Sequence, residues 1–165
     1  MARAVLIVED EPDQNEMLAQ LVKRRGFSVV QTYLGKEGVN RARESPPDLL
    51  LLDLMLPDID GFEVCESLRR SRDTNLIPIV MATQLTDAAR RLQGFRVGAN
   101  AYVVKPYSRE QIYDAIDIAL ATPRRGIAGA MLPAPGRGAS PSALALTLAL
   151  AVSLRPGEKT KCSSP

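Results

Sequence analysis

The chain has no histidine and no tryptophan among its 165 residues, and it has only two cysteines. Without histidine it cannot form a histidine-ligated metal site or a Ser-His-Asp triad, and it cannot carry a phosphohistidine itself. Any phosphohistidine step must therefore take place on a partner. Because Cys65 and Cys162 lie far apart in the sequence, we expect no disulfide framework, and a reducing, cytoplasmic location is expected.

A strong excess of either charge is absent too, since 21 basic and 19 acidic residues give a formal net charge of +2. Residues 1–121 carry 15 basic and 18 acidic residues, whereas residues 122–165 carry six basic residues and only Glu158. This distribution indicates a mildly acidic body with a basic tail. The body has no basic stripe interleaved with aromatics, so nucleic acid is not an expected partner. We also expect no membrane span and no signal peptide before Glu9.

Short apolar runs alternate with helical patterns through residues 1–121, which is typical of βαβ units. The expected strands are residues 5–8, 27–30, 49–52, 77–82 and 101–104. The pattern therefore predicts one α/β domain, with a doubly wound five-stranded parallel sheet and five helices. In the first helix, Met17, Leu18, Leu21 and Val22 are predicted to form the buried face. Asp60 is the expected N-cap of the third helix, and Ser108–Gln111 forms an expected capping box for the fifth; the second and fourth helices are expected near residues 36–43 and 86–97.

From Thr122 onward the composition shifts to proline, glycine, alanine and serine. It predicts a low-complexity tail, residues 122–165, that is linker-like or disordered. Residues 142–154 alternate leucine with small residues, so a strand-like period conflicts with a helix-forming composition. No structural prediction is made for that stretch.

Charged and hydroxyl side chains follow four of the predicted strands. Glu9 and Asp10 follow the first, Asp53 the third, Thr83 the fourth and Lys105 the fifth. Because ligands bind at the carboxyl ends of parallel strands, we expect these side chains to converge on one rim of the sheet. Three acids, a hydroxyl and an ammonium suit a divalent metal ion and a phosphoryl group.

Each of these residues has a plainer interpretation when taken alone. Glu9-Asp10-Glu11 could be a solvated cluster that caps the first helix. Lys105 could face solvent, and Tyr102 could be an ordinary strand aromatic. Asp53 is the hardest to explain in this way, because a structural buried aspartate needs a hydrogen-bond partner. Together, the positions favour a functional site.

Four motifs stand in order along the chain: VLIVEDEP at residues 5–12, LLDLMLPDIDG at 51–61, MAT at 81–83 and GANAYVVKP at 98–106. With them, residues 3–121 resemble the receiver domain of bacterial two-component response regulators, a chemotaxis-regulator-like module of flavodoxin-like fold. Transferred by position, the resemblance implies that Asp53 is the phosphoacceptor. It also implies that Glu9, Asp10, Asp53 and the backbone carbonyl of Met55 bind Mg²⁺.

The resemblance further implies that Lys105 pairs with one phosphoryl oxygen and that Thr83 hydrogen-bonds another. It implies a cis peptide between Lys105 and Pro106. Thr83 and Tyr102 would form a switch, in which phosphorylation draws Thr83 inward and lets the ring of Tyr102 rotate. That rotation would repack the surface of residues 84–121.

The implied function is a phosphoprotein that accepts a phosphoryl group from a sensor histidine kinase or a histidine phosphotransfer protein and then binds a downstream protein. Homodimerisation on phosphorylation is left open. The chain is not expected to be a turnover enzyme, because Met55 stands where a phosphohydrolase of the haloacid dehalogenase kind, with Asp53 as its nucleophile, would carry its second aspartate. An alternative is a truncated or divergent DNA-binding transcriptional regulator whose basic tail contacts phosphates.

One position departs from the common family pattern. Gln84 stands where alanine or glycine is usual, so a longer side chain lies beside the expected phosphoryl group. Met55 and Leu85, which flank the site in the family, are both apolar here. Because apolar neighbours hinder an attacking water, we expect a long-lived phosphoryl group.

Overall fold

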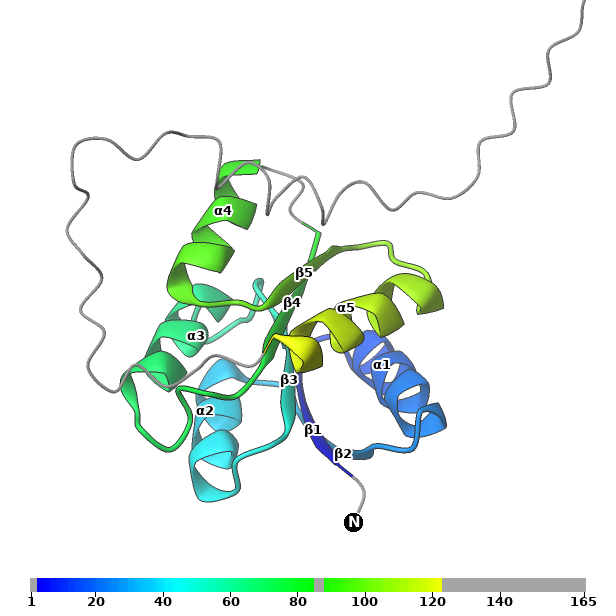
Figure 1. Cartoon of the computed structure of the whole chain (residues 1–165), viewed down its shortest axis with the longest axis horizontal. Helices are drawn as coiled ribbons and strands as arrows, with labels where there is room; N and C mark the ends of the chain where they lie inside the picture. Colours follow the sequence, from blue (N-terminus) through cyan, green and yellow to red (C-terminus); the bar gives the residue numbers. More distant parts are fainter. Residues whose placement is uncertain (1–2, 85–87, 123–165) are drawn as a thin grey trace, which may run out of the picture. The chain divides into compact units, whose positions relative to one another are not determined.

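The computed structural model describes residues 3–84 and 88–122, so the tail and the start expected for the fourth helix lie outside the described residues. Five strands alternate with five helices along the chain (Figure 1). The strands are β1 (Ala4–Val8), β2 (Ser28–Thr32), β3 (Leu49–Asp53), β4 (Ile79–Thr83) and β5 (Ala101–Val104). The helices are α1 (Pro12–Arg24), α2 (Gly35–Glu44), α3 (Gly61–Arg70), α4 (Ala88–Val97) and α5 (Arg109–Ala121).

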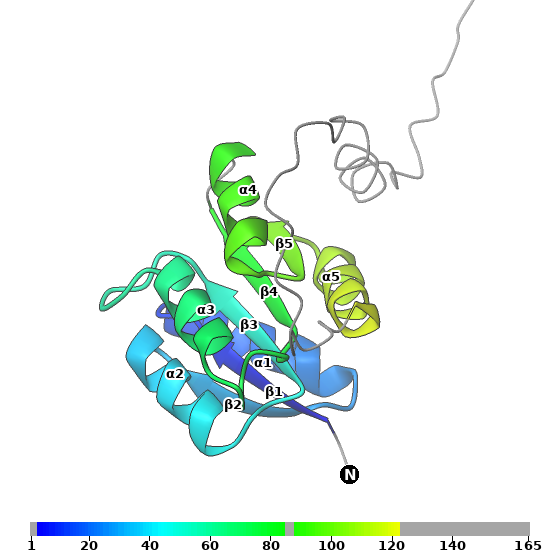
Figure 2. The same ribbon diagram turned by 60° about the vertical axis from the view of Figure 1, so that its left-hand side comes forward.

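The five strands form one parallel sheet in the order β2-β1-β3-β4-β5. Helices α1 and α5 cover one face, and α2, α3 and α4 cover the other (Figures 1 and 2). This is the predicted doubly wound α/β fold. The register pairs Val8 with Leu52, Asp53 with Ala82 and Thr83 with Val104, so the carboxyl ends of four strands lie at one edge. That edge is where the predicted site residues follow their strands.

The central strands β3 and β4 are buried along their whole length, which explains why their sequences are continuous apolar runs. Their side chains feed two hydrophobic clusters, one on each face of the sheet. Asp53 is the acidic residue of β3, and its side chain enters this buried setting at the strand's last position. The sheet thus places a carboxylate at the boundary between core and solvent.

The first helix corrects one prediction. Met17 is 44% exposed, whereas Asn15 is fully buried together with Leu18, Ala19 and Val22. The buried face follows positions i, i+3, i+4 and i+7 from Asn15, and Met17 lies off that stripe. The prediction is confirmed for Leu18 and Val22 and wrong for Met17, because it started from the apolar residues and passed over a buried amide.

Two strand predictions also shift. β2 extends to Thr32, beyond the predicted end at Val30, and β4 begins at Ile79. Ile77 is buried but belongs to a turn, because its N–H donates to the carbonyl of Thr74. The expected N-cap Asp60 and the capping box of α5 are confirmed by their hydrogen bonds. Within the described ranges, no helix is both long and apolar enough to cross a membrane.

Candidate functional site

Three charged side chains meet at the carboxyl edge of the sheet. Lys105 Nζ donates to Asp53 Oδ2 at 2.7 Å and to Glu9 Oε2 at 2.7 Å. The three side chains are only 7%, 6% and 2% exposed, respectively. Buried ions persist where they are paired, so two carboxylates share one ammonium here. The cluster therefore has an excess of negative charge.

That excess changes the acidity of its members. Burial raises the pKa of the Glu9 carboxyl to about 7, with the hydrogen bond to Lys105 opposing the shift and the charge on Asp53 adding to it. For Lys105, burial alone lowers the pKa, but the contacts with Asp53 and Glu9 outweigh it and the pKa lies above its ordinary value. The ammonium of Lys105 therefore stays charged at neutral pH.

A third acid completes a candidate cation site. Carboxylate oxygens of Glu9, Asp10 and Asp53 lie within 4.8 Å of one another. Glu9 Oε1 is buried and, among the residues that the structure describes, has no hydrogen-bond partner. An oxygen in this state fits a hard cation, which prefers carboxylate ligands and retains part of its water. The donor set therefore fits Mg²⁺.

These acids border a cavity of about 410 Å³. It is lined by Glu9, Asp10, Glu11, Asp53, Met55, Gln84 and Lys105. The amide of Met55 donates to Asp53 Oδ1 at 3.1 Å, and the side chain of Met55 is 60% exposed. Gln84 is exposed at the same cavity, and Leu85 lies outside the described residues. The oxygens of Asp53 are thus reachable from solvent on a side flanked by Met55 and Gln84.

Asn15 fixes the loop that carries two of the acids. Its Nδ2 donates to the carbonyl of Glu9 at 2.8 Å and to the carbonyl of Thr32 at 2.9 Å, and its Oδ1 accepts from Gln31 Nε2 at 3.0 Å. The side chain thereby ties the end of β1 to the end of β2. Sequence reasoning missed Asn15, although its place on the buried stripe of α1 was a usable signal.

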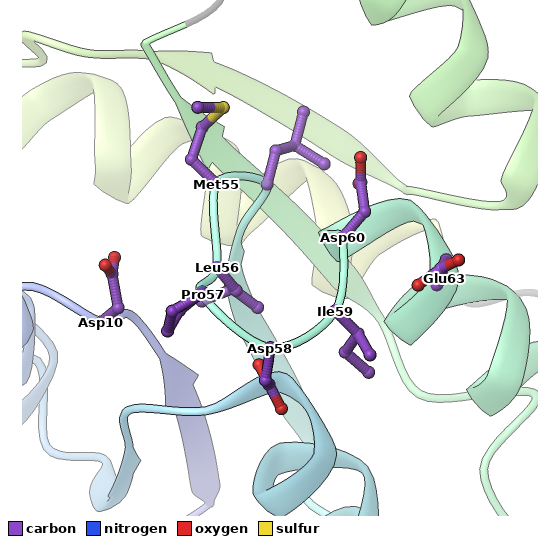
Figure 3. A pocket seen from close by; sticks show the side chains of 9 residues that line it. Asp10, Met55, Leu56, Pro57, Asp58, Ile59, Asp60 and Glu63 are labelled. Atoms are coloured by element: carbon purple, nitrogen blue, oxygen red, sulfur yellow. The ribbon is translucent and has the colours of Figure 1, made fainter.

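Two features fix the loop between β3 and α3: the close approach of Gly61 to the backbone of Asp53, and the hydrogen bonds of Asp58 to the first residues of α2. A Cβ on Gly61 would lie 2.4 Å from the carbonyl oxygen of Asp53, so only glycine fits there. Asp58 accepts from the amides of Gly35 and Lys36 at 2.8 and 2.9 Å, which caps α2 from another loop. Figure 3 shows the side chain of Asp58 directed to that end of α2, beside a second cavity of about 410 Å³.

The remaining predicted residues are spread around this cluster. Thr83 is fully buried beside β3 and does not line the cavity of the acids. Tyr102 is half-buried and packs against the core cluster on the α3 and α4 side. The peptide between Lys105 and Pro106 is cis, as expected. The structure thus brings Lys105 into contact with Glu9 and Asp53. Thr83 and Tyr102 lie outside this contact.

Tyr107 adds a group that the sequence did not indicate. Its hydroxyl is buried and, in the described part of the chain, has no hydrogen-bond partner. Burial raises the pKa of this phenol, and the charges on Glu9 and Asp53 raise it further. The hydroxyl therefore stays protonated close to the acid cluster. No local pattern distinguishes such a tyrosine from a core aromatic.

Residues 5–117 match the family model of the response regulator receiver domain. The chain belongs to this family. The receiver domain covers most of the described residues and includes every residue of the acid and lysine cluster. Domains of this family bind Mg²⁺ at an acidic site, interact with histidine kinases and in general are not turnover enzymes.

The receiver is 39% identical over 108 residues to the DNA-binding dual master transcriptional regulator RpaA of Synechocystis sp.. The match covers 66% of this chain and 45% of RpaA, so the chain spans less than half of that relative. RpaA is described as a protein that binds DNA.

Two solved structures show the same fold. The chemotaxis protein CheY4 of Vibrio cholerae is 26% identical with a TM-score of 0.69, and the match covers 73% of this chain and 100% of CheY4. The receiver domain of the sensor histidine kinase PA1611 of Pseudomonas aeruginosa is 23% identical with a TM-score of 0.68, covering 74% of this chain and 100% of that domain. That receiver domain has a magnesium ion coordinated in its active-site cleft.

Proposed function

We propose that this receiver domain accepts a phosphoryl group on Asp53, with Mg²⁺ held by Glu9, Asp10, Asp53 and the backbone carbonyl of Met55. The observation that carries the proposal is the contact of Lys105 with Asp53 and Glu9 in a buried cluster, where Glu9 Oε1 has no hydrogen-bond partner among the described residues. A purely structural ion pair would balance its charges. This cluster instead holds more negative charge than its ammonium neutralises.

The transfer uses the carboxylate of Asp53 as the nucleophile. An oxygen of Asp53 attacks the phosphorus of a phosphohistidine on the donor protein, and the P–N bond breaks as the O–P bond forms. The leaving imidazole keeps the electron pair of the broken bond and takes up a proton. Lys105, already 2.7 Å from Asp53, places its charge beside the incoming phosphoryl oxygens. When bound, Mg²⁺ supplies further positive charge that offsets the repulsion between the phosphoryl group and the three acids.

The switch is part of the same proposal. Thr83 lies on β4 next to β3, and its hydroxyl would bind a phosphoryl oxygen on Asp53 after a small inward movement. Tyr102 would then rotate and repack the surface of residues 84–121 for a downstream protein. In a Thr83→Ala variant that is phosphorylated as fully as wild type, amide NMR shifts over residues 88–122 should respond much less to phosphorylation. An undiminished response would contradict the switch.

The main test is mass spectrometry after incubation with acetyl phosphate and Mg²⁺. The wild-type chain should gain about 80 Da, the mass of one phosphoryl group, and Asp53→Asn should gain none. Asp114→Asn, an exposed aspartate on α5, is the matched control and should be phosphorylated like wild type. An equal adduct on Asp53→Asn, or none on a wild-type chain that binds Mg²⁺, would overturn the proposal. Because Met55 flanks the cavity, we also expect the adduct to persist for longer than seconds.

A transcriptional role is the second candidate, and the likeness to RpaA favours it. In this case the receiver would regulate DNA binding, and the basic residues of 122–165 would contact phosphates. Fluorescence anisotropy with a labelled duplex at 50 and 200 mM salt tests this directly. Binding that weakens steeply with salt would support contacts with the phosphate backbone, whereas no binding at 50 mM salt would exclude DNA as a partner of this chain.

A further inference from the structure

Asn15 is a polar residue that is fully buried on the inner face of α1. Its Nδ2 donates to the carbonyl of Glu9 at 2.8 Å and to the carbonyl of Thr32 at 2.9 Å, and its Oδ1 accepts from Gln31 Nε2 at 3.0 Å. A buried amide is tolerated where such bonds replace those that it would form with water. The amino group of Asn15 is therefore committed to backbone carbonyls at the carboxyl ends of β1 and β2.

The carbonyl of Glu9 belongs to the peptide unit that joins Glu9 to Asp10. The last register pair of β1 and β2 is Val8 with Thr32, so this peptide lies just beyond the strand. The amide of Glu9 donates to the carbonyl of Thr32 at 3.2 Å, and Asn15 binds the carbonyl of the same Glu9. The backbone of Glu9 is thus held by a hydrogen bond at each end, and the peptide plane between the two acids is fixed by a side chain from α1.

That peptide carries two acids of the candidate cation site. Carboxylate oxygens of Glu9, Asp10 and Asp53 lie within 4.8 Å of one another. Mg²⁺ requires ligand oxygens at about 2.0–2.1 Å in near-octahedral geometry, so it tolerates little displacement of its ligands. A turn of the peptide plane between Glu9 and Asp10 would move two of the three carboxylates relative to the third. The bond from Asn15 therefore opposes a displacement that would separate the donors.

Gln31 fixes the orientation of the amide of Asn15. Oδ1 of Asn15 faces an N–H of Gln31, and Nδ2 faces two carbonyl oxygens, so exchanging the two ends of the amide would set acceptor against acceptor. Gln31 Nε2 also donates to Oε2 of the exposed Glu16 at 3.3 Å. Because Gln31 is only half-buried, a substitution there would loosen Asn15 without removing atoms from the core.

We propose that Asn15 is a positioning residue for the metal site: by holding the carbonyl of Glu9, it fixes the carboxylates of Glu9 and Asp10 relative to Asp53. This inference rests on the proposed function, in which those three acids bind Mg²⁺. Asn15 does not itself line the cavity of the acids, so it acts through the backbone of Glu9. Substituting a residue that orients metal ligands in this way typically lowers metal affinity by about 10–100-fold.

The test is Mg²⁺ binding to the full, unphosphorylated chain, followed by amide NMR shifts. In Asn15→Ala, which loses the donor group, the dissociation constant for Mg²⁺ should rise about tenfold or more. Val22→Ala is the matched control, because it removes atoms from the same buried face of α1 but no hydrogen bond of the side chain. It should lose stability in urea unfolding and still bind Mg²⁺ as wild type does. Equal weakening in both variants, or an unchanged dissociation constant in a folded Asn15→Ala chain, would overturn the inference.

Gln31→Ala is a second variant that keeps Asn15 in place. It removes the bond that orients the amide, so the dissociation constant for Mg²⁺ should rise by about twofold or more. Gln20→Ala is its control, since Gln20 bonds to the same Glu16 but not to Asn15 within the described structure, and it should bind Mg²⁺ like wild type. If Asn15→Ala does not fold, a Gln31→Ala chain that binds Mg²⁺ as tightly as wild type would overturn the inference.

The Mg²⁺ dependence of phosphorylation separates positioning from a general loss of structure. With acetyl phosphate, Asn15→Ala should need about tenfold or more Mg²⁺ for half-maximal phosphorylation and should approach the wild-type rate at saturating Mg²⁺. A purely structural role would lower the rate at every Mg²⁺ concentration, and that result would overturn the inference. A wild-type chain that binds no Mg²⁺ would instead overturn the proposed function on which the inference rests.

Discussion

Two clusters of charge at opposite ends of the sheet are stabilised in different ways. At the carboxyl ends of the strands, Lys105 pairs with two buried acids, Glu9 and Asp53. At the amino ends of β4 and β5, the guanidinium of Arg69 is bonded to neutral oxygens. Arg69 Nε and Nη2 donate to the carbonyl of Gly98 at 3.1 and 2.8 Å, and Nη1 donates to the carbonyl of Asn75 at 3.2 Å.

The cluster at the amino ends extends through Asn100. Its Oδ1 accepts from Arg69 Nη2 at 3.3 Å and from the amide of Ile79 at 3.0 Å, and its Nδ2 donates to the carbonyl of Thr122 at 2.7 Å. These bonds join the end of α3, the start of β4 and β5 and the end of α5. Apart from the bond between Arg69 Nη2 and Asn100 Oδ1, each of these bonds joins a side chain to a backbone carbonyl or amide.

The comparison of these two clusters distinguishes charges that stabilise the fold from charges that are suited to a function. Arg69 and Asn100 form hydrogen bonds with the backbone groups around them, and these bonds link the ends of α3, α4 and α5. The cluster of Lys105 holds surplus negative charge and, within residues 3–84 and 88–122, a carboxylate oxygen without a hydrogen-bond partner. Both cost stability and suit a cation and a phosphoryl group. Substitutions at the Arg69 end should therefore reduce stability and spare phosphorylation, whereas those at the Lys105 end should alter both.

Lys105→Met should have the largest effect. It leaves Glu9 and Asp53 buried without a counter-ion, so we expect the free energy of unfolding to fall by about 3–5 kcal/mol at pH 8 in EDTA. Urea unfolding measures this loss, and phosphorylation should fail in the same variant. Lys36→Met, at an exposed lysine, is the control and should change stability by less than about 0.5 kcal/mol. A loss below about 1 kcal/mol for Lys105→Met would mean that the acids do not depend on the ammonium.

Arg69→Ala should come next, with a loss of about 3 kcal/mol, because several carbonyls lose their donors at once. Mass spectrometry should still show full phosphorylation of the folded variant. Arg70→Ala is the control, since Arg70 is exposed and pairs only with Glu66 one turn earlier in the described structure. The comparison would break if Arg69→Ala unfolded no more easily than Arg70→Ala, or if its phosphorylation failed while the protein remained folded.

The pH dependence of stability distinguishes the two ends without disturbing Arg69. The folded pKa of Glu9 is about 7 against an ordinary value of 4.5, so the folded state holds this proton more tightly than the unfolded state. The contribution of Glu9 to the free energy of unfolding is therefore greatest below about pH 4.5. Without metal, it falls by about 2–3 kcal/mol as the pH rises through 7. The difference between wild type and Glu9→Gln, from urea unfolding in EDTA across pH 5–8, should show this decline. A flat difference would contradict the shift.

Asp58→Ala gives the smallest effect and sharpens the comparison. Asp58 lies at the same end as Asp53, but its oxygens are satisfied by the amides of Gly35 and Lys36. Like Arg69, it should therefore contribute to stability without affecting phosphorylation. In urea unfolding, we expect Asp58→Ala to lower the free energy of unfolding by about 1 kcal/mol. Asp58→Asn keeps one acceptor oxygen and should lose less. If Asp58→Ala abolished phosphorylation, the role of an acid would depend on its location at the carboxyl ends of the strands and not on the group to which it is bonded.

Local sequence signals predicted much of the fold. The apolar runs of β3 and β4, the N-cap Asp60 and the capping box from Ser108 all depend on residues within four positions of one another. The convergence of Glu9, Asp53 and Lys105 could also be predicted, because parallel strands bring their carboxyl ends to one edge. Met17 and Asn15 show what these local signals could not predict, because hydrophobicity alone does not reveal which polar side chain of a helix will be buried.

Other features depend on residues that only folding brings together. The amino-acid sequence by itself determined the alternation of strands and helices, the strand-end acids and lysine, and hence the receiver fold. Tertiary structure decided that Lys105 contacts Glu9 across 96 positions, that Arg69 meets Gly98 across 29, and that Gly94 lies against Tyr102. Those contacts depend on how closely helices approach the sheet, which follows from the packing of all side chains between them and leaves no periodic trace in the sequence.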